Sequence, residues 1–397
     1  MLRLKDTQYP NTASFLQSAI AIAEYFGFTP LEEAARRDPS EIREIRRRAR
    51  GNEKEISFAR KEERPLAGVA RRLALLARTA DESILVWRIS KDMKGNVPAV
   101  SLELHIIGTQ SAIAEALLIV IANSIAREAG VPECVLSINN IGSPESSGRF
   151  VRDVSTFLRK HIESISATLR PRAAVDPLGT LIALIERGHP ATPRSPQPME
   201  YLTEEERQRF WELLEYLEMF GLPYELSPSV LGSRDCWAHS LFQLSVIDPE
   251  SRTRVPIAFG GRYDPLAARF AAAPLPASMI AITCEIRGKI RVKREPPSTP
   301  SIYFAHLGTE ARRRALSVLE SLRKAGIPVR HGLYHERIGE QMAAARKLAS
   351  PYVLIMGHKE AIEGTILVRE VATNSQDAIP LPELTHYLKR RRFASVA

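Results

Sequence analysis

Apolar positions along the chain follow two different periods. Residues 83–90 (SILVWRIS) and 99–107 (AVSLELHII) have the short, β-branched pattern of strands and flank the turn-forming segment KDMKGN, so they are predicted to pair. Residues 12–26 repeat apolar side chains with helical spacing, and residues 111–129 predict a helix with a broad apolar face that stops at Gly130. The first part of the chain therefore mixes strands and helices in an α+β manner.

The same reasoning predicts the remaining elements of this part. Further strands are expected at 133–139, 241–247, 254–259 and 279–284, and further helices at 39–50, 150–165 and 203–220. The strands 241–247 and 254–259 are expected to form a hairpin. The proline-rich segment 188–198 (GHPATPRSPQP) predicts a loop between two helical stretches.

From residue 301 onward the predicted elements alternate. The expected order is strand 301–305, helix 309–325, strand 328–331, helix 338–348, strands 352–356 and 365–369, and helix 381–389. Such alternation indicates a mixed or parallel sheet with helices packed on it. The segment before it, 288–300 (GKIRVKREPPSTP), is basic and proline-rich without any period, which is typical of a linker. We therefore predict an α+β domain over 1–287, a linker over 288–300 and a small α/β domain over 301–397.

Composition narrows the class of protein. The chain has 397 residues, of which 44% are hydrophobic and 25% charged, as in ordinary globular proteins. Its three cysteines lie far apart and form no CxxC pair, which argues against a disulfide scaffold and a cysteine zinc site. No apolar stretch is long enough to cross a bilayer, and the first residues lack the apolar core of a secretory signal. We expect a cytoplasmic protein that does not associate with a membrane.

The positive charge lies in the second part of the chain. Residues 1–287 hold 36 basic and 36 acidic side chains, whereas residues 288–397 hold 19 basic and 10 acidic ones, which accounts for the net charge of +9. Such a surface suits a polyanion such as RNA, although it is equally compatible with a solubilising surface. The candidate RNA contacts are the cations that end the last helix, Lys389, Arg390, Arg391 and Arg392. A solvated helix end, favoured by the helix dipole, is the alternative interpretation.

The segment Phe259-Gly260-Gly261-Arg262-Tyr263-Asp264 is the most informative motif. Two adjacent glycines after a strand permit close backbone approach, and polar side chains follow at once; the plain alternative is a tight strand end with surface residues. Phosphate-cradling GxxxxGK[ST] and dinucleotide GxGxxG motifs do not occur. The pair His331 and His335 spans a glycine-containing loop, so we predict loop histidines and no metal site.

The GGRYD segment resembles the second histidine-specific motif of histidyl-tRNA synthetases, which are class II aminoacyl-tRNA synthetases. Segments similar to the family follow in order at 102–115, 131–139 and 201–229, and residues 301–385 resemble its anticodon-binding domain; the resemblance covers roughly residues 5–390. It implies an α+β class II synthetase-like core with an antiparallel sheet and a small C-terminal α/β anticodon-binding-like domain. It also implies a homodimer and tRNA as a partner.

Positions that carry catalysis in the family differ here. Its motif 2 arginine corresponds to Arg88, but the glutamate two residues later is Ser90. The family's Pro-Glu-Gly-Thr segment aligns with residues 63–66 (Glu-Arg-Pro-Leu), which places a cation and an aliphatic chain where an acid and a hydroxyl hold the substrate's ammonium. Ser101 and His105 stand where the family has a glutamine and a glutamate in its histidine pocket.

The first histidine motif and motif 3 differ as well. The catalytic arginine of the first histidine motif corresponds to Gly232, with Arg234 two residues away, and the ATP-binding arginine of motif 3 corresponds to Ile286, with Arg287 next to it. The candidate catalytic residues are therefore Arg88, Arg234 and Arg287. The candidate ligand-pocket residues are Gly260, Gly261, Arg262, Tyr263, Asp235 and Glu285. The two acids are alternatively structural partners of Arg262 or Arg287.

Three functional hypotheses follow from this pattern. The first is a synthetase-like protein without aminoacylation activity that binds tRNA or other RNA, or regulates a partner, and for which no cofactor is certain. The second is an active, divergent histidine–tRNA ligase that uses ATP and Mg²⁺. The third is a histidine-sensing protein like the regulatory subunit of ATP phosphoribosyltransferase, which generally lacks the anticodon-binding domain expected here. Since losing one preorganised transition-state charge costs about 3–4 kcal/mol, several such changes together favour the first hypothesis.

Overall fold

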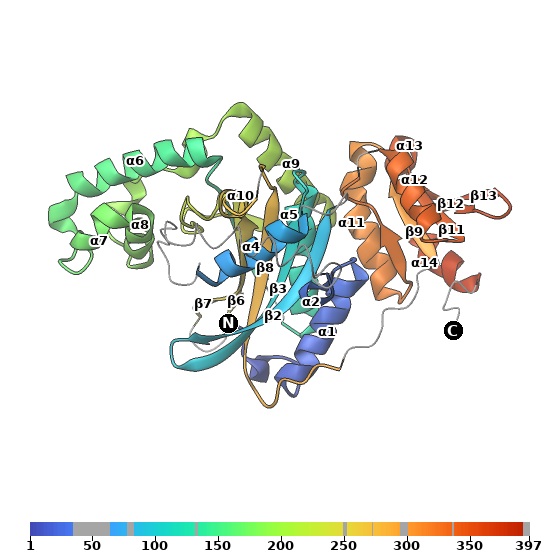
Figure 1. The fold of residues 1–397 in the computed structure, drawn as a ribbon, viewed down its shortest axis with the longest axis horizontal. Coiled ribbons are helices and arrows are strands. Elements are labelled where there is room, and N and C mark those ends of the chain that lie inside the picture. Colours follow the sequence, from blue (N-terminus) through green and yellow to red (C-terminus); the bar gives the residue numbers. More distant parts are fainter. Residues whose placement is uncertain are drawn as a thin grey trace.

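The computed structural model describes residues 1–34, 64–77, 83–131, 134–248, 252–271, 273–293, 301–335 and 337–391. The predicted helix 39–50 lies outside these ranges, as does Arg392. Two β-sheets dominate the described part, and each has its own set of helices (Figure 1). The larger belongs to the first part of the chain and the smaller to residues 301–391, which we call the C-terminal unit.

The larger sheet has eight strands. They are β1 (Thr29–Pro30), β2 (Ile84–Lys94), β3 (Val97–Ile107), β4 (Cys134–Asn140), β5 (Tyr224–Leu226), β6 (Ala238–Ile247), β7 (Arg254–Arg262) and β8 (Ala277–Glu285). Their order in space is β1-β2-β3-β8-β7-β6-β4-β5. The inner pairs are antiparallel, and the outermost pairs, β1 with β2 and β4 with β5, are parallel. The predicted α+β core with an antiparallel sheet is thereby confirmed.

One face of this sheet is covered by long apolar helices. They are α1 (Thr12–Tyr25), α5 (Ile113–Glu128) and α9 (Glu204–Phe220), and α5 packs between the other two and against β8. Residues 113–126 of α5 are all buried, which explains its broad apolar pattern. Thr203 and Glu206 form a capping box at the start of α9, and Gly221 ends it at a φ of +75°.

The opposite face is covered only in part. Short helices α2 (Leu31–Ala34) and α10 (Asp264–Ala268) and the longer α4 (Arg64–Ala77) contribute to a second apolar cluster there, which includes Leu73, Leu266 and Met279. The described part also holds 3₁₀ turns at Leu4–Asp6, Ile162–Ser164, Thr192–Arg194 and Pro198–Tyr201. The rest of this face carries polar side chains.

A helical arm extends from the core on the side away from the C-terminal unit (Figure 1). It consists of α6 (Pro144–Lys160), α7 (Arg170–Val175) and α8 (Pro177–Glu186). The helix predicted at 150–165 begins earlier, because Ser143 accepts a hydrogen bond from the Ser146 backbone and caps the helix ahead of a proline. The short helices α7 and α8 were not predicted. Each has a proline in its first turn, and the Asp176 carboxylate caps α8 by accepting from Gly179 N at 2.9 Å.

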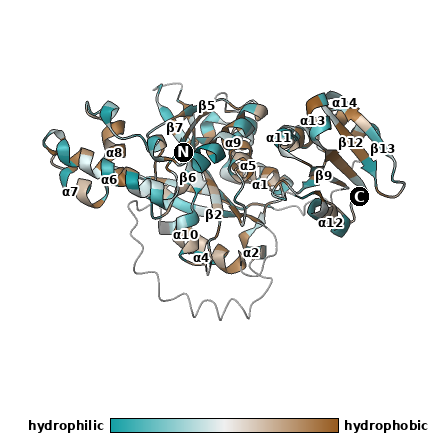
Figure 2. Ribbon diagram, turned by 90° about the horizontal axis from the view of Figure 1, so that it is seen from above, coloured by the Kyte–Doolittle hydropathy of each residue, from teal (hydrophilic) through white to brown (hydrophobic). Residues whose placement is uncertain are grey.

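The C-terminal unit has a five-stranded sheet in the order β10-β9-β11-β12-β13. Its strands are β9 (Ile302–His306), β10 (Val329–His331), β11 (Tyr352–Met356), β12 (Thr365–Glu370) and β13 (Gln376–Pro380), and its helices are α11 (Thr309–Lys324), α12 (Ile338–Lys347), α13 (His358–Glu363) and α14 (Leu381–Arg390). The first three strands in this order are parallel, and β12 and β13 are antiparallel additions. All residues of β9 are buried, whereas the edge strand β13 is mostly exposed and hydrophilic (Figure 2). This mixed sheet was predicted, but β13 and α13 were not.

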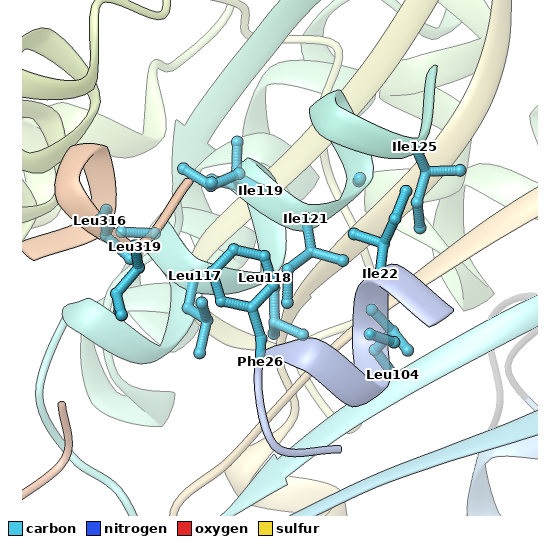
Figure 3. Close-up of a cluster of buried hydrophobic side chains, with 14 of the residues drawn as sticks. Ile22, Phe26, Leu104, Leu117, Leu118, Ile119, Ile121, Ile125, Leu316 and Leu319 are labelled. Carbon is cyan, nitrogen blue, oxygen red and sulfur yellow. The ribbon is translucent and has the colours of Figure 1, made fainter. Parts of the chain in front are cut away.

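The two parts share one apolar core. Leu316 and Leu319 of α11 lie against Leu117 and Leu118 of α5, and Phe26 lies beside them (Figure 3). Polar contacts surround this cluster. Ser124 Oγ donates to Glu320 Oε1 at 3.1 Å, Arg323 Nη1 pairs with Glu128 Oε1 at 2.5 Å, and Tyr25 Oη donates to Ile327 O at 2.9 Å. The domain boundaries predicted at 287 and 301 stay a prediction, because the buried cluster contains residues from both sides of them and does not separate two domains.

Candidate functional site

The register of β2, β3 and β8 gathers polar side chains on the partly open face of the large sheet. Arg88 lies opposite Glu103, and Ser101 lies opposite both Ser90 and Thr283. Alternate residues of the same strands face α1 and α5 with apolar side chains, as expected for a sheet with one buried face. Ser101 Oγ and Thr283 Oγ1 are hydrogen-bonded at 2.7 Å. The polar face is thus a continuous patch at the centre of the sheet.

A closed ion pair lies at the centre of this patch. Arg88 Nε donates to Glu103 Oε2 at 2.7 Å and Nη2 donates to Oε1 at 3.1 Å, while Ser90 Oγ also donates to Oε1. Burial alone would raise the pKa of the Glu103 carboxyl, but hydrogen bonds from His105 and Arg88 outweigh it and lower the pKa to about 2. Glu103 therefore stays ionised, and it accepts both of the guanidinium hydrogen bonds described for Arg88.

His105 extends this network into the core. The ring is fully buried; its Nε2 lies 3.4 Å from Glu103 Oε2 and its Nδ1 lies 3.0 Å from Tyr263 Oη. Burial lowers the pKa of His105, so the imidazole is neutral near pH 7. The tautomer that fits both neighbours donates from Nε2 to the carboxylate and accepts the Tyr263 hydroxyl proton at Nδ1. The network Arg88–Glu103–His105–Tyr263 is therefore internally satisfied.

The two glycines of the GGRYD segment allow very close packing inside the sheet. A Cβ on Gly260 would lie 2.3 Å from Met279 O and 2.5 Å from the Phe242 ring, and one on Gly261 would lie 2.6 Å from Ser240 O. Both positions thus require glycine for a structural reason.

Arg262 and Asp264 brace the end of β7. Arg262 is 2% exposed, donates to Thr109 O at 3.2 Å and to Asp264 Oδ2 at 3.0 Å, and pairs with Glu115 Oε2 at 3.3 Å. The other oxygen of Asp264 accepts from Ala277 N at 2.7 Å, which ties β7 to the start of β8.

A fully buried glutamate, which we had not singled out, joins three elements here. Glu115 of α5 accepts from Arg209 Nη2 of α9 at 2.7 and 2.8 Å, in addition to its pair with Arg262 of β7. Burial opposes ionisation of Glu115, but the charges of Arg209 and Arg262 outweigh it and lower its pKa. No local sequence pattern predicts this cluster, because Arg209 and Arg262 lie 94 and 147 positions away from Glu115 in the sequence.

A cavity of about 650 Å³ adjoins this cluster, between the core and α11. Arg209, His239, Arg262, Asp264 and Arg312 contribute to its walls. Gly261 and His105 both pair with Met279, so they lie on the same face of the sheet. Arg262, the next residue after Gly261, therefore points to the opposite face, which the long helices cover. The cavity lies where β3 and β7 end and β8 begins, with Gln110, Arg262 and Pro276 in its walls, and Arg88 is not part of it.

Comparison with known proteins shows what this chain is similar to. Residues 301–391 match the family model described as anticodon binding domain. "Histidine--tRNA ligase 1" of Shouchella clausii is 28% identical over 283 residues, which cover 70% of this chain and 66% of that ligase. The histidine–tRNA ligase of Symbiobacterium thermophilum is 26% identical over 296 residues, 73% of this chain and 68% of that ligase. This chain is a divergent relative of the histidyl-tRNA synthetases.

The chain spans about two thirds of the length of these curated relatives. Among solved structures, apo histidyl-tRNA synthetase from S. aureus aligns over 81% of both chains at 19% identity, with a TM-score of 0.45. The C-terminal match and the similarity to histidine–tRNA ligases agree with the family predicted from the GGRYD segment.

The three candidate catalytic arginines of this synthetase relative lie on separate elements. Arg88 is on β2, Arg234 is exposed in the loop before β6 beside Gly148 of α6, and Arg287 is exposed after the end of β8. Glu103, the partner of Arg88, pairs with Ala281 on β8. At the rise per residue of an antiparallel strand, Arg287 lies about 20 Å further along the chain than Ala281. The described structure does not bring these three side chains together.

Two acids proposed for the pocket have structural partners other than those we had considered. Asp235 Oδ1 accepts from Arg269 at 3.1 Å, and Glu285 Oε1 accepts from the Leu4 backbone at 2.7 Å. Both acids thus have structural roles, as the alternative interpretation held, but the partners that the structure describes are Arg269 and the Leu4 backbone instead of Arg262 or Arg287. Arg262 is instead neutralised by Glu115 and Asp264, and Arg287 lies past the strand.

Other predicted positions are partly described. Leu66 is buried in the second apolar cluster, whereas Glu63 and the side chain of Arg64 lie outside the described part. His331 ends β10 and is buried, so it is not a surface loop residue. Within the described ranges, no group of three or more histidines, cysteines or acids could hold a metal ion, and no helix is long and apolar enough to cross a membrane.

The C-terminal cations differ in their surroundings. Lys389 and Arg390 are exposed at the end of α14. Arg391 instead pairs with Asp377 Oδ2 at 3.0 Å and lies 4.9 Å above the Tyr387 ring. Arg392 lies beyond the described residues. Two of the four predicted RNA-contact cations are thus fully presented to solvent, and a third is tied to its own unit.

Proposed function

We propose that this synthetase relative does not activate histidine and acts by binding RNA, tRNA included, through its C-terminal unit. The observation that supports the first half is the bidentate pair between Arg88 and Glu103. Class II adenylation needs a cation that clamps the α-phosphate of ATP, and Arg88 is the residue that corresponds to it. A guanidinium already held by a carboxylate on the next strand is not available for that contact.

Energetics supports this reading of Arg88. Separating a largely buried ion pair leaves an uncompensated charge and costs about 3–5 kcal/mol. The Arg88 and Glu103 side chains are 19% and 11% exposed, so water offers little compensation. That cost is comparable to the roughly 3–4 kcal/mol that one preorganised charge contributes to a transition state. Breaking the Arg88–Glu103 pair to contact ATP would therefore cost about as much free energy as the new contact would provide.

The site for the substrate's ammonium is altered as well. His105 stands where the family has a glutamate, and it is buried and neutral. The carboxylate nearest to it, Glu103, is already balanced by Arg88. A histidine ammonium placed on this face would thus find no unpaired negative charge among the described residues.

RNA binding is supported by charge and by the match to the anticodon binding domain. Residues 301–397 carry 15 basic and nine acidic side chains, a net charge of +6. Lys389 and Arg390 extend into solvent at the end of α14, and no partner of either is described. Lysine and arginine side chains of this kind bind phosphates without reading sequence.

The first test is histidine-dependent exchange of pyrophosphate into ATP, measured beside an active histidine–tRNA ligase at equal concentration. We expect no exchange above a no-histidine control for this chain. Exchange at a rate comparable to the control ligase would reject the proposal and establish a divergent ligase that uses ATP and Mg²⁺.

The second test is tRNA binding at two salt concentrations. We expect binding that weakens with salt, and a K389E/R390E variant that binds at least tenfold less tightly with a lower salt slope. The matched control is K91E/K94E, which changes the same charge at the exposed end of β2. Absence of tRNA binding at low salt would contradict the proposal. Tight histidine binding in its place would favour a histidine-sensing regulatory role.

The proposal also includes a homodimer in the cytoplasm, as the family resemblance implies. Light scattering of the purified chain tests the first point, with twice the 44.3 kDa chain mass as the expected result. A monomer at micromolar concentration would exclude a stable dimer.

A further inference from the structure

A second cavity, of about 360 Å³, lies where the C-terminal unit meets α1 and β2. Phe26, Gly27 and Leu85 form the wall from the core. The facing wall includes the aromatic side chains of Tyr303 and Tyr334. Its volume falls in the range of small-ligand sites, and both units contribute to it.

The charges around this cavity are of one sign. Arg330 of β10 and Lys347 of α12 are cationic, and no acid contributes to its described walls. Arg330 Nη1 lies 3.9 Å from where a Cβ on Gly27 would stand, so the guanidinium reaches the core side of the cavity. Within the described ranges, neither cation has a hydrogen bond or an ion pair.

A buried histidine adds hydrogen-bonding capacity to the same wall. His331 is 8% exposed, and neither of its ring nitrogens makes a hydrogen bond within the described structure. Burial, reinforced by the charge of Arg330, lowers the pKa of His331 to about 3. The ring is therefore neutral, with one donor and one acceptor nitrogen. Unsatisfied buried polar groups of this kind cost about 1–3 kcal/mol each, which a ligand oxygen would offset.

We propose that this cavity binds a mononucleotide, with its phosphate held by Arg330 and Lys347 and its base held against the aromatic wall. Two cations with no partner among the described residues match the charge of a phosphate monoester, and a guanidinium binds phosphate oxygens in a bidentate manner. Bases stack on aromatic side chains irrespective of their sequence. The neutral His331 supplies a donor and an acceptor beside them. This inference does not depend on the proposed RNA binding, since Lys389 and Arg390 are not part of the cavity.

The test is calorimetric titration of the full chain with AMP, adenosine and inorganic phosphate. We expect AMP to bind at one site per chain, and adenosine and phosphate to bind at least tenfold more weakly, because each supplies only half of the contacts. An R330Q variant should lose at least tenfold in AMP affinity, and K347Q should lose less because Lys347 is exposed at the rim. The control variant, K359Q, removes an exposed cation of α13 and should bind AMP as the wild type does. Unchanged thermal unfolding of R330Q establishes that it is folded.

Three results would overturn the proposal. They are no AMP binding at millimolar concentration, equal AMP binding by wild type and R330Q, and binding of an RNA oligonucleotide that depends on Arg330 while AMP does not compete. The last result would assign the cavity to RNA. Failure of AMP to bind leaves the salt-dependent tRNA test unaffected, so the two proposals fail separately.

Discussion

Arg88 and Glu103 face each other on adjacent strands and share two hydrogen bonds, at 2.7 and 3.1 Å. Under our proposal, this pair decides whether Arg88, which corresponds by resemblance to the family's motif 2 arginine, is available to a substrate phosphate. Ser90 donates to the same carboxylate, so the residue that replaces the family's glutamate reinforces the closed arrangement. The chemistry of the site therefore follows from a cross-strand contact inside the protein.

Replacing Glu103 with glutamine should destabilise the protein by about 3 kcal/mol, because Arg88 would keep its charge while losing its counter-ion. Urea unfolding near pH 7 measures this change. The matched control is E363Q on α13, whose partner Lys359 is 77% exposed, and which should change stability by less than about 0.5 kcal/mol. Equal effects of the two substitutions would contradict a structural role for the Arg88 pair.

The difference between wild type and E103Q should also depend on pH. The pKa of Glu103 is lowered to about 2 in the folded state, so its contribution is complete above its ordinary value of 4.5 and is lost as the pH falls from 4.5 towards 2. Over that window the wild type should lose about 3 kcal/mol relative to the variant. Urea midpoints at pH 6 and pH 3 check this. A gap of the same size at both pH values would contradict it.

Glu115 should be the most sensitive acid on the other side of the sheet. An E115Q substitution leaves Arg209 and Arg262 without the carboxylate that they share, and we expect a loss of about 3–5 kcal/mol. Thermal unfolding with far-UV circular dichroism measures it. If E115Q unfolds at the wild-type temperature, the buried cluster does not brace α5, α9 and β7.

The glycine motif should be intolerant of even one added methyl group. In G260A the new Cβ would approach Met279 O and the Phe242 ring within 2.5 Å, so we expect destabilisation of about 3 kcal/mol from overpacking. The control is G339A on α12, where nothing lies within 4 Å and alanine favours the helix. Denaturant midpoints should fall for the first variant and stay or rise for the second.

The elements that were predicted well are those whose hydrophobic pattern is complete within one continuous segment of the chain. Helix α5 has an unbroken apolar face, and β2 and β3 alternate around a two-residue turn at 95–96. The short helices α7 and α8 begin with prolines, and the edge strand β13 has no buried side to impose alternation, so neither gave a comparable signal.

The site was only partly predictable for a related reason. The turn after Lys94 pairs it with Val97 and thereby sets Arg88 opposite Glu103, so this pair was accessible from the hairpin register alone. Glu115, Arg209 and Arg262 come from three distant segments, and only the folded chain brings them together. Arg234 and Arg287 were chosen by their nearness in sequence to substituted positions, which does not determine where their side chains reach.

The most direct measurement is single-turnover formation of histidyl-adenylate, with the purified chain in excess over radiolabelled ATP and with saturating histidine and Mg²⁺. Our account predicts no adenylate above the no-histidine background over a period in which an active ligase converts all of its ATP. Accumulation of adenylate at a comparable rate would show that the Arg88–Glu103 pair opens for substrate, and would contradict the account.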